Sequence, residues 1–309
     1  MIVQAPMLAV PSRMVAPTPE STVAALHARG DCLWQPKWDG IRAFAYVEDG
    51  TARLINRLDV DISDRYPDVI TALSNAYPAT ESRVFDGELL VFHDGVPEFA
   101  RVHRRNAQSN ARRIHYLTQS DPATFMAFDL LYVDGRDIRH DPLTVRLSLL
   151  SRMVDDGDHL MISPTSDNGP RLWQIVVEQH LEGVVAKHQR SKYTGRRDWA
   201  WVKIKTARRL FALVTGWEPG KGGRSGHVGA LILSLVDPRG RLVPVGKVGT
   251  GIREIDHVPL LRLLATGKPF VVEVEYQETS SNRQLRFPSL KAYGQNVDPS
   301  ACKINQLSY

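Results

Sequence analysis

A short polar segment near residue 37 carries residue types that could support covalent catalysis. Lys37 is followed by Asp39, Gly40 and Arg42. A lysine amine attacks an activated phosphorus only when it is unprotonated, and desolvation or neighbouring cations favour that state. Asp39 could orient the lysine, Gly40 would allow a close turn around a nucleotide, and Arg42 presents a planar fork for ribose or phosphate oxygens. A solvent-exposed turn without a catalytic role would also fit this segment, so the choice between the two interpretations depends on other segments of the chain.

Three later segments place charged residues on apolar strands. Glu88 interrupts an apolar run at residues 84–92, and Glu182 leads a second run at residues 182–187. Lys203 and Lys205 stand two residues apart in a third strand, so both side chains point to one face. Each could be a solvent-facing charge, but the apolar flanks of Glu88 favour burial, where an unpaired carboxylate is costly. These segments add two carboxylates and a pair of lysines to the candidate residues around Lys37.

In this order, the four segments resemble the motifs of the covalent nucleotidyltransferase superfamily. They are most similar to ATP-dependent DNA ligases, especially the small bacterial enzymes and the ligase modules of bacterial end-joining proteins. The segment around Phe128, residues 127–135, resembles a further ligase motif. The resemblance covers about residues 5–300, and the combination of motifs is far more specific than any one of them.

The resemblance implies a three-step reaction. Lys37 attacks the α-phosphate of ATP, expels pyrophosphate and carries AMP; the AMP passes to the 5′-phosphate at a nick in duplex DNA, and the 3′-hydroxyl displaces it. Mg²⁺, or Mn²⁺ in its place, is expected on Glu88 and Glu182. Phe128 is expected to stack on adenine. The full set of expected nucleotide-binding residues is Gln35, Arg42, Arg57, Glu88, Phe128, Lys203 and Lys205.

Basic residues outside these motifs are candidates for contact with DNA phosphates. The expected contacts come from the loop after the second glutamate strand and from a glycine-rich turn in the C-terminal part: Arg190, Lys192, Arg196, Arg197, Lys221 and Arg224. A further basic cluster, residues 101–105 with Arg112 and Arg113, is expected on a helix. For that cluster, DNA contact and simple solvation are equally consistent with the sequence.

Composition sets broad limits on the protein. Among 309 residues, 39 are Lys or Arg and 34 are Asp or Glu, a net charge of +5 that is compatible with a polyanionic partner without requiring one. The sequence has no long apolar run and no secretory leader, which predicts a cytoplasmic protein without a membrane segment. Cys32 and Cys302 are expected to be free thiols. We expect a monomer whose partners are nicked duplex DNA and repair proteins.

The predicted fold is α+β, with two domains. Residues 42–57 alternate around a turn at Asp49 and predict a hairpin. Helices are expected at residues 63–76, at 142–154 with Asp141 as the cap, and at 171–181. After residue 206 the pattern predicts strands at 211–217, 228–236, 242–248 and 271–276, with a helix at 254–265. Short strands with one inserted helix are typical of a small five-stranded barrel of the oligonucleotide-binding type.

By resemblance, the domains have separate roles. Residues 1–206 are expected to form a nucleotidyltransferase (ATP-grasp-like) adenylation domain of antiparallel sheets and helices, and residues 207–309 an OB-fold domain. Relatives usually end with an Arg-x-Asp-Lys motif, which is not recognisable at residues 291–299; Arg286 matches the segment before it, and Lys291 or Lys303 is a candidate to substitute. Gln35 stands where many relatives carry a glutamate. The hypothesis that follows is weak ATP activation with retained sealing of an adenylated nick.

Other functions are also consistent with the sequence. An RNA ligase or a GTP-using capping enzyme would use the same lysine chemistry, although the segments around Phe128 and Lys203 look more like those of DNA ligases. A non-catalytic nucleic-acid-binding relative is a second alternative, which the altered terminal motif favours.

Overall fold

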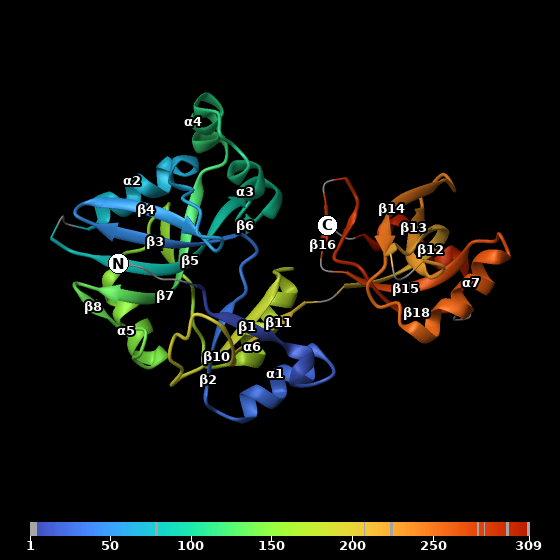
Figure 1. The fold of residues 1–309 in the computed structure, drawn as a ribbon, viewed down its shortest axis with the longest axis horizontal. Coiled ribbons are helices and arrows are strands. Elements are labelled where there is room, and N and C mark those ends of the chain that lie inside the picture. Colours follow the sequence, from blue (N-terminus) through green and yellow to red (C-terminus); the bar gives the residue numbers. More distant parts are fainter. Residues whose placement is uncertain are drawn as a thin grey trace. The chain divides into compact units, whose positions relative to one another are not determined.

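The chain divides into two compact units in a computed structural model (Figure 1). The first unit is Met1–Thr206 and the second is Ala207–Tyr309. The structure describes residues 5–77, 80–206, 208–222, 225–276, 278–280, 282–294 and 297–307. Within these ranges, no helix is long and apolar enough to span a membrane.

A four-stranded sheet carries much of the chemistry predicted for the first unit. Its strand order is β1-β11-β10-β2. The strands are β1 (Leu8–Pro11), β2 (Cys32–Pro36), β10 (Gly183–His188) and β11 (Arg197–Lys205). Only β1 and β11 run parallel among these pairs. Helices α1 (Pro19–Ala28) and α6 (Gly169–Glu178) pack on one face, where Trp34, Val184 and Ile204 form an apolar core. The opposite face is therefore left for other contacts.

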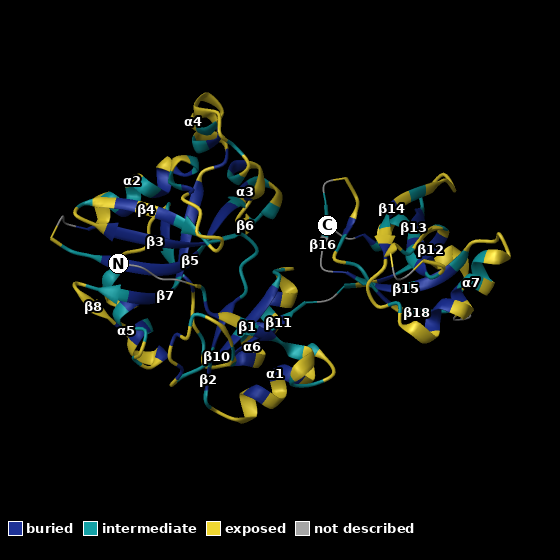
Figure 2. Cartoon of the chain, viewed as in Figure 1, coloured by how far each residue is buried: buried dark blue, intermediate teal, exposed yellow. Residues whose placement is uncertain are grey.

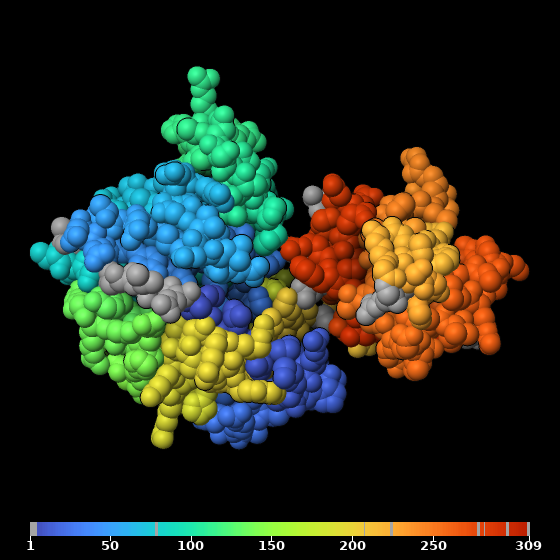
Figure 3. Space-filling model, in the orientation of Figure 1, coloured from blue at the N-terminus to red at the C-terminus, as the bar shows by residue number. Residues whose placement is uncertain are grey.

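A larger sheet forms the other half of the first unit, with the central order β4-β3-β5-β7-β8. Its strands are β3 (Ile41–Glu48), β4 (Thr51–Asn56), β5 (Arg83–His93), β6 (Val96–Pro97), β7 (Ala123–Val133), β8 (Arg136–Asp137) and β9 (Leu160–Ile162). Helices α2 (Pro67–Ala76), α3 (Phe99–Asn106) and α5 (Leu143–Met153) contact this sheet. Their inward faces are buried against it and their outer faces are exposed (Figure 2). Helix α4 (Ala111–Ser120) projects from the surface of the unit (Figure 3).

The two sheets of the first unit share a small apolar core. It joins Phe44, Tyr46, Val84 and Leu131 of the larger sheet to Trp201 of β11, with Met7 and Tyr193 beside them. The predicted hairpin is present as β3 and β4, whose turn residues Asp49 and Gly50 have φ of +51° and +71°. A two-residue turn with both φ values positive matches the twist of the strands it joins.

Three helix starts differ from the prediction. Pro67 divides the predicted 63–76 helix into a 3-10 turn, Ser63–Arg65, and α2. The cap expected from Asp141 is wrong, because α5 begins after Pro142 without a side-chain cap. The Asp141 carboxylate instead pairs with Arg136 at 2.7 Å. Helix α6 begins two residues earlier than predicted, where Asn168 Oδ1 accepts a hydrogen bond from the Arg171 N–H.

The second unit has a five-stranded antiparallel sheet in the order β14-β13-β12-β15-β18. Its strands are β12 (Arg208–Pro219), β13 (Val228–Val236), β14 (Leu242–Val248), β15 (Phe270–Tyr276) and β18 (Ser289–Tyr293). A two-stranded ribbon, β16 (Glu278–Thr279) and β17 (Leu285–Arg286), follows β15, and helix α7 (His257–Ala265) precedes it. The strand at 289–293 is an element that the sequence analysis missed.

Both cysteines are free, as predicted, and the structure shows that both are buried. Burial raises the pKa of the Cys32 thiol to about 12 and that of Cys302 to about 11.

Candidate active site

Three neighbouring strand ends bring Lys37, Glu182 and Lys205 together. Gly183 pairs with Lys205 across β10 and β11, and the Lys37 N–H donates to the Gly183 carbonyl at 2.8 Å. Lys37 Nζ lies 2.5 Å from Glu182 Oε2, and Lys205 Nζ lies 2.8 Å from Glu182 Oε1. The carboxylate is thus shared by two lysines at one end of the sheet.

The free face of the same sheet carries further polar residues in register. Gln35, Val185 and Lys203 lie in one row across β2, β10 and β11, and Leu33, Lys187 and Trp201 lie in the next. Side chains two residues apart in a strand share a face, so these rows continue the one that ends in Lys37 and Lys205. Burial lowers the pKa of Lys203, and the charges of Lys205 and Lys37 lower it further.

Glu88 reaches the same region from the larger sheet. It stands opposite Arg42 in the β3–β5 ladder and is half-buried. Burial raises the pKa of its carboxyl to about 8, against the opposing effect of the Lys37 and Arg42 charges. Within the described residues, Glu88 has no hydrogen-bond or ion-pair partner. Its oxygens, together with those of Glu182, could therefore bind a hard divalent cation.

Gly40 is required by a close approach of protein backbone. A Cβ atom at this position would lie 2.3 Å from the Leu89 carbonyl oxygen and 2.8 Å from Glu88 Cγ. The expected role for Gly40 was a turn around the nucleotide. The structure adds a second reason, which is that the segment after Lys37 packs directly on β5 beside Glu88.

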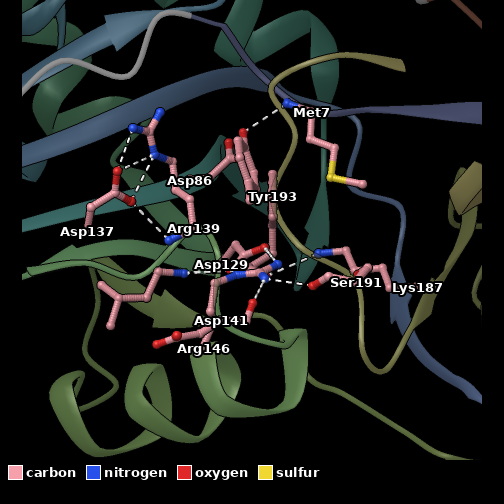
Figure 4. Close-up of polar contacts among 12 residues, drawn as sticks. Met7, Asp86, Asp129, Asp137, Arg139, Asp141, Arg146, Lys187, Ser191 and Tyr193 are labelled. Atoms are coloured by element: carbon pink, nitrogen blue, oxygen red, sulfur yellow. Dashed lines mark hydrogen bonds and ion pairs between the residues drawn. The ribbon is translucent and has the colours of Figure 1, made fainter. Parts of the chain in front are cut away.

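Arg42 is held by a carboxylate and a tyrosine that the sequence analysis did not identify. Its Nε lies 3.0 Å from Asp86 Oδ1 and its Nη2 lies 2.6 Å from Asp86 Oδ2. The Tyr193 hydroxyl donates to Asp86 Oδ2 at 2.7 Å and accepts from the Met7 N–H at 3.0 Å (Figure 4). Burial and the Asp86 charge raise the pKa of Tyr193 well above its ordinary value. A lone tyrosine in a loop gives no sequence signal for this role.

Phe128 and Gln35 lie on facing sheets. The Phe128 ring is half-buried, with Arg42 Cζ 5.3 Å from its centroid. Gln35 is buried and its Nε2 donates to Thr165 Oγ1 at 3.0 Å. Gln35 Oε1 is buried without a partner in the described part of the chain. The two residues approach each other through Gln35 Nε2, which lies 3.5 Å from the Phe128 carbonyl oxygen.

The remaining predicted residues are exposed wherever the structure describes them, and of these Arg197 has a charge that acts on Lys203 and lowers its pKa. Arg57 is exposed in the turn after β4 and, among the described residues, forms no hydrogen bond or ion pair with the cluster. Arg190, Lys192 and Arg196 are exposed in the loop between β10 and β11. Arg197 is exposed and its Nη1 donates to the Ala9 carbonyl at 2.6 Å. Lys221 is exposed in the second unit, and Arg224 lies outside the described residues.

The basic cluster at residues 101–105 is largely paired within the protein. Arg105 is buried against Asp68, with nitrogen–oxygen distances of 2.6 and 2.8 Å. Arg101 and Arg104 both pair with Asp121. Arg112 and Arg113 stand on a separate helix, α4, so the expectation of one helix is wrong. Arg105 joins α3 to Asp68 of α2, whereas Arg101 and Arg104 join α3 to the residue that follows α4.

The altered terminal motif begins on β18. Lys291 Nζ pairs with Glu275 Oε1 at 2.8 Å, so its charge is already compensated within the second unit. Lys303 is exposed, and Gln295 and Asn296 lie outside the described residues.

Comparisons with known proteins give a consistent picture. A family model described as the ATP dependent DNA ligase domain matches residues 6–205. The multifunctional non-homologous end joining protein LigD of Mycolicibacterium smegmatis is 30% identical over 96% of this chain and 39% of its own length. A DNA ligase of Pyrobaculum calidifontis is 29% identical over 74% of this chain and 41% of its own length. The chain thus spans about two fifths of these curated relatives.

Solved structures agree with these matches. The ligase domain of M. tuberculosis LigD aligns with a TM-score of 0.55 at 29% identity, covering 96% of this chain and 97% of that chain. A mycobacterial DNA ligase D complexed with ATP and MES has the same TM-score at 27% identity and covers the same shares.

Proposed function

Because the chain belongs to the family of ATP-dependent DNA ligases, we propose that it seals nicks in duplex DNA through a covalent adenylate on Lys37. The observation that carries the proposal is the pairing of Lys37 and Lys205 with the Glu182 carboxylate at one end of the four-stranded sheet. Glu88 interacts electrostatically with Lys37 and Glu182 from the second sheet. A nucleophilic amine, two carboxylates and further cations are the groups that phosphoryl transfer needs.

In the first step, Lys37 Nζ forms a bond to the α-phosphorus of ATP, and the bond from that phosphorus to the leaving pyrophosphate breaks. Lys37 Nζ donates an N–H to Glu182 Oε2 at 2.5 Å. Nucleotide binding must part this pair before the amine can attack. Lys203 and Lys205 would then face the phosphate oxygens, whose charge grows as the bond breaks.

The two glutamates fit a hard divalent cation. Glu88 has no partner among the described residues, and the Glu182 carboxylate pairs with Lys37 and Lys205. Mg²⁺ typically takes one or two carboxylates and completes its shell with water and substrate phosphates. Mg²⁺, or Mn²⁺ in its place, would be held by Glu88 and Glu182 and would neutralise phosphate charge during the displacement.

The nucleotide would be bound between the two sheets. Phe128 is the proposed stacking platform for adenine, and the unpaired Gln35 Oε1 is an acceptor suited to an exocyclic amino group. Arg42 keeps guanidinium N–H groups beyond those that bind Asp86, which suits the ribose or phosphate oxygens. Arg57 remains a candidate for the ribose or the 5′-phosphate.

The two units would have different roles in the reaction. Residues 1–206 would be the adenylation domain and residues 207–309 an OB-fold domain. The sheet order in the second unit supports a closed barrel, because a bridge joins Thr250, just after β14, to Ser289 of the other edge strand. The position of α7 between β14 and β15 also fits this fold.

DNA phosphates would be bound by the exposed loop residues Arg190, Lys192 and Arg196, with Arg197 beside the loop. Lys221 and Arg224 would add contacts from the second unit. Relatives named for non-homologous end joining support a setting in DNA repair. Repair proteins would then be partners of the chain, which we expect to act as a monomer.

Intact-protein mass spectrometry after incubation with ATP tests the proposal. The expected result is a gain equal to one adenylate in the wild type and none in Lys37→Ala. Labelled duplexes with a nick in a DNA strand or an RNA strand then distinguish a DNA ligase from an RNA ligase. A protein that acquires no adduct and seals neither nick would be a non-catalytic relative, and the proposal would fail.

The altered terminal motif adds a hypothesis about the balance of steps. Because its Arg-x-Asp-Lys pattern is absent and Lys291 is paired with Glu275, we expect slow self-adenylation but retained sealing of a pre-adenylated nick. The two rates are measured separately with labelled ATP and with a pre-adenylated duplex. Equal and fast rates in both assays would remove the hypothesis.

A further inference from the structure

Phe128 is the extra residue of a β-bulge. Along the β5–β7 ladder, Gly87 pairs with Ala127 and Asp86 pairs with Asp129, so Phe128 has no partner on β5. A bulge takes one residue out of the ladder and redirects its side chain. The peptide of Phe128 must therefore be fixed by groups other than its own sheet.

The carbonyl oxygen of Phe128 is bound from the four-stranded sheet. Lys187 Nζ on β10 donates to it at 3.1 Å, and Gln35 Nε2 on β2 lies 3.5 Å away. The same Nζ lies 4.6 Å from the centroid of the Phe128 ring and 4.0 Å from the Trp201 ring. Lys187 thus contacts both the peptide and the ring of the bulged residue and links the two sheets.

The other side of the bulge is fixed by a buried arginine. Arg146 Nε lies 2.8 Å from Asp129 Oδ1 and its Nη2 lies 2.9 Å from Asp129 Oδ2. Arg146 Nη1 also donates to the Ser191 carbonyl at 2.8 Å (Figure 4). The residue after Phe128 is therefore rigidly held, and Lys187 supplies the matching restraint on Phe128 itself.

Burial of Lys187 has a cost that packing alone does not explain. The residue is 2% exposed, and within the described part of the chain no carboxylate forms an ion pair with it. Desolvation lowers the pKa of its amine to about 7. An apolar side chain of similar volume would fill this space without desolvating an amine. A buried, unpaired amine therefore points to a role in function.

We propose that Lys187 is a positioning residue that holds the bulged peptide of Phe128, so that its ring is set to stack on the nucleobase of ATP. The inference rests on the proposed function, in which Phe128 is that platform. Lys187 acts through Phe128 and not on the phosphates. Its loss should weaken binding of the base and leave the reaction at phosphorus intact.

The test measures the rate of adenylate formation against ATP concentration by intact-protein mass spectrometry. Lys187→Met should raise the half-saturating ATP concentration about tenfold, the factor expected for one lost hydrogen bond, with a maximal rate within about twofold of the wild type. Inhibition by tripolyphosphate, which has no base, should not change. Lys268→Met, an exposed lysine in the second unit, is the matched control and should behave as the wild type.

Two further variants separate positioning from a general structural effect. In Phe128→Leu, the added Lys187→Met change should have no effect on half-saturation, because the group it positions is gone. Lys187→Arg keeps a donor and a charge, and should fall between the wild type and Lys187→Met. Equal weakening of ATP and tripolyphosphate, additive effects in the double variant, or Lys187→Arg as weak as Lys187→Met would each overturn the inference. Absence of any adduct in the wild type would instead refute the proposed function.

Discussion

Replacing the buried amine with an apolar group should change how stability depends on pH. Lys187 has an ordinary pKa of about 10.4 in an unfolded chain, whereas burial lowers it to about 7 in the folded protein. The charges around it are mixed: Asp129 and Asp86 raise this pKa, and Arg42 and Arg146 lower it. Between pH 7 and 10, the unfolded chain therefore binds more protons at this site than the folded protein does.

The sign and size of the effect follow from this difference. Stability rises with pH wherever the unfolded state binds more protons, with a slope of at most about 1.4 kcal/mol per pH unit for one group. Relative to Lys187→Met, the wild type should gain about 2 kcal/mol between pH 7 and pH 9. The gain between pH 6 and pH 7 should be below about 0.5 kcal/mol, because both states are then largely protonated.

Urea unfolding of the wild type and of Lys187→Met at pH 6, 7, 8 and 9 measures this difference. Subtracting the two free energies of unfolding at each pH cancels the contributions of the other titrating groups. Tryptophan fluorescence is a suitable signal, since five of the six tryptophans lie in the first unit, at positions 34, 38, 173, 199 and 201. A difference that stays constant from pH 7 to pH 9, or that shrinks, would refute the account of Lys187 as a desolvated amine.

Three other changes have expected outcomes. Tyr193→Phe removes the hydroxyl that bridges Asp86 and the Met7 N–H, and should lower the free energy of unfolding by about 2 kcal/mol in urea titrations. Asp68→Asn leaves Arg105 buried without its counter-charge and should lower the free energy of unfolding by about 3–5 kcal/mol. Glu98→Gln, at a partly exposed pair with Arg101, should lower it by under about 1 kcal/mol. Similar losses in the two variants would contradict this reasoning. Serine at positions 190, 192 and 196 together should weaken binding to a nicked duplex and reduce its salt dependence by about three ion equivalents; an unchanged salt slope would exclude these side chains from phosphate contact.

Local patterns predicted the elements well. The β3–β4 hairpin and strands β12 to β15 of the second unit follow from alternation and turn residues, which depend only on nearby sequence, whereas β18 was missed. The segments around Lys37, Glu88 and Glu182 were assigned to one site through their resemblance to ligase motifs. Their mutual distances could not be predicted, because Lys37 and Glu182 are 145 residues apart and meet only through strand register.

Residues that act through tertiary contacts gave little or no signal. Tyr193 belongs to no motif, yet it holds Asp86 and thereby Arg42. The sequence also did not predict that Arg101 and Arg104 pair with Asp121, because this carboxylate comes from the loop after α4. Lys187 ends the ligase-like segment that begins at Glu182, which made it a weak candidate without a defined role, because its contacts depend on a bulge in a different sheet.

The inertness of the two native thiols has a practical consequence. Thiolates are the species that react with maleimides, and raised pKa values at Cys32 and Cys302 keep both groups protonated near neutral pH, with little access for a reagent. New cysteines at exposed positions such as Glu20 and Lys268 should therefore take up fluorophores selectively, without removal of the native ones. Energy transfer between dyes on the two units would then report any change in their separation when ATP or a nicked duplex is added.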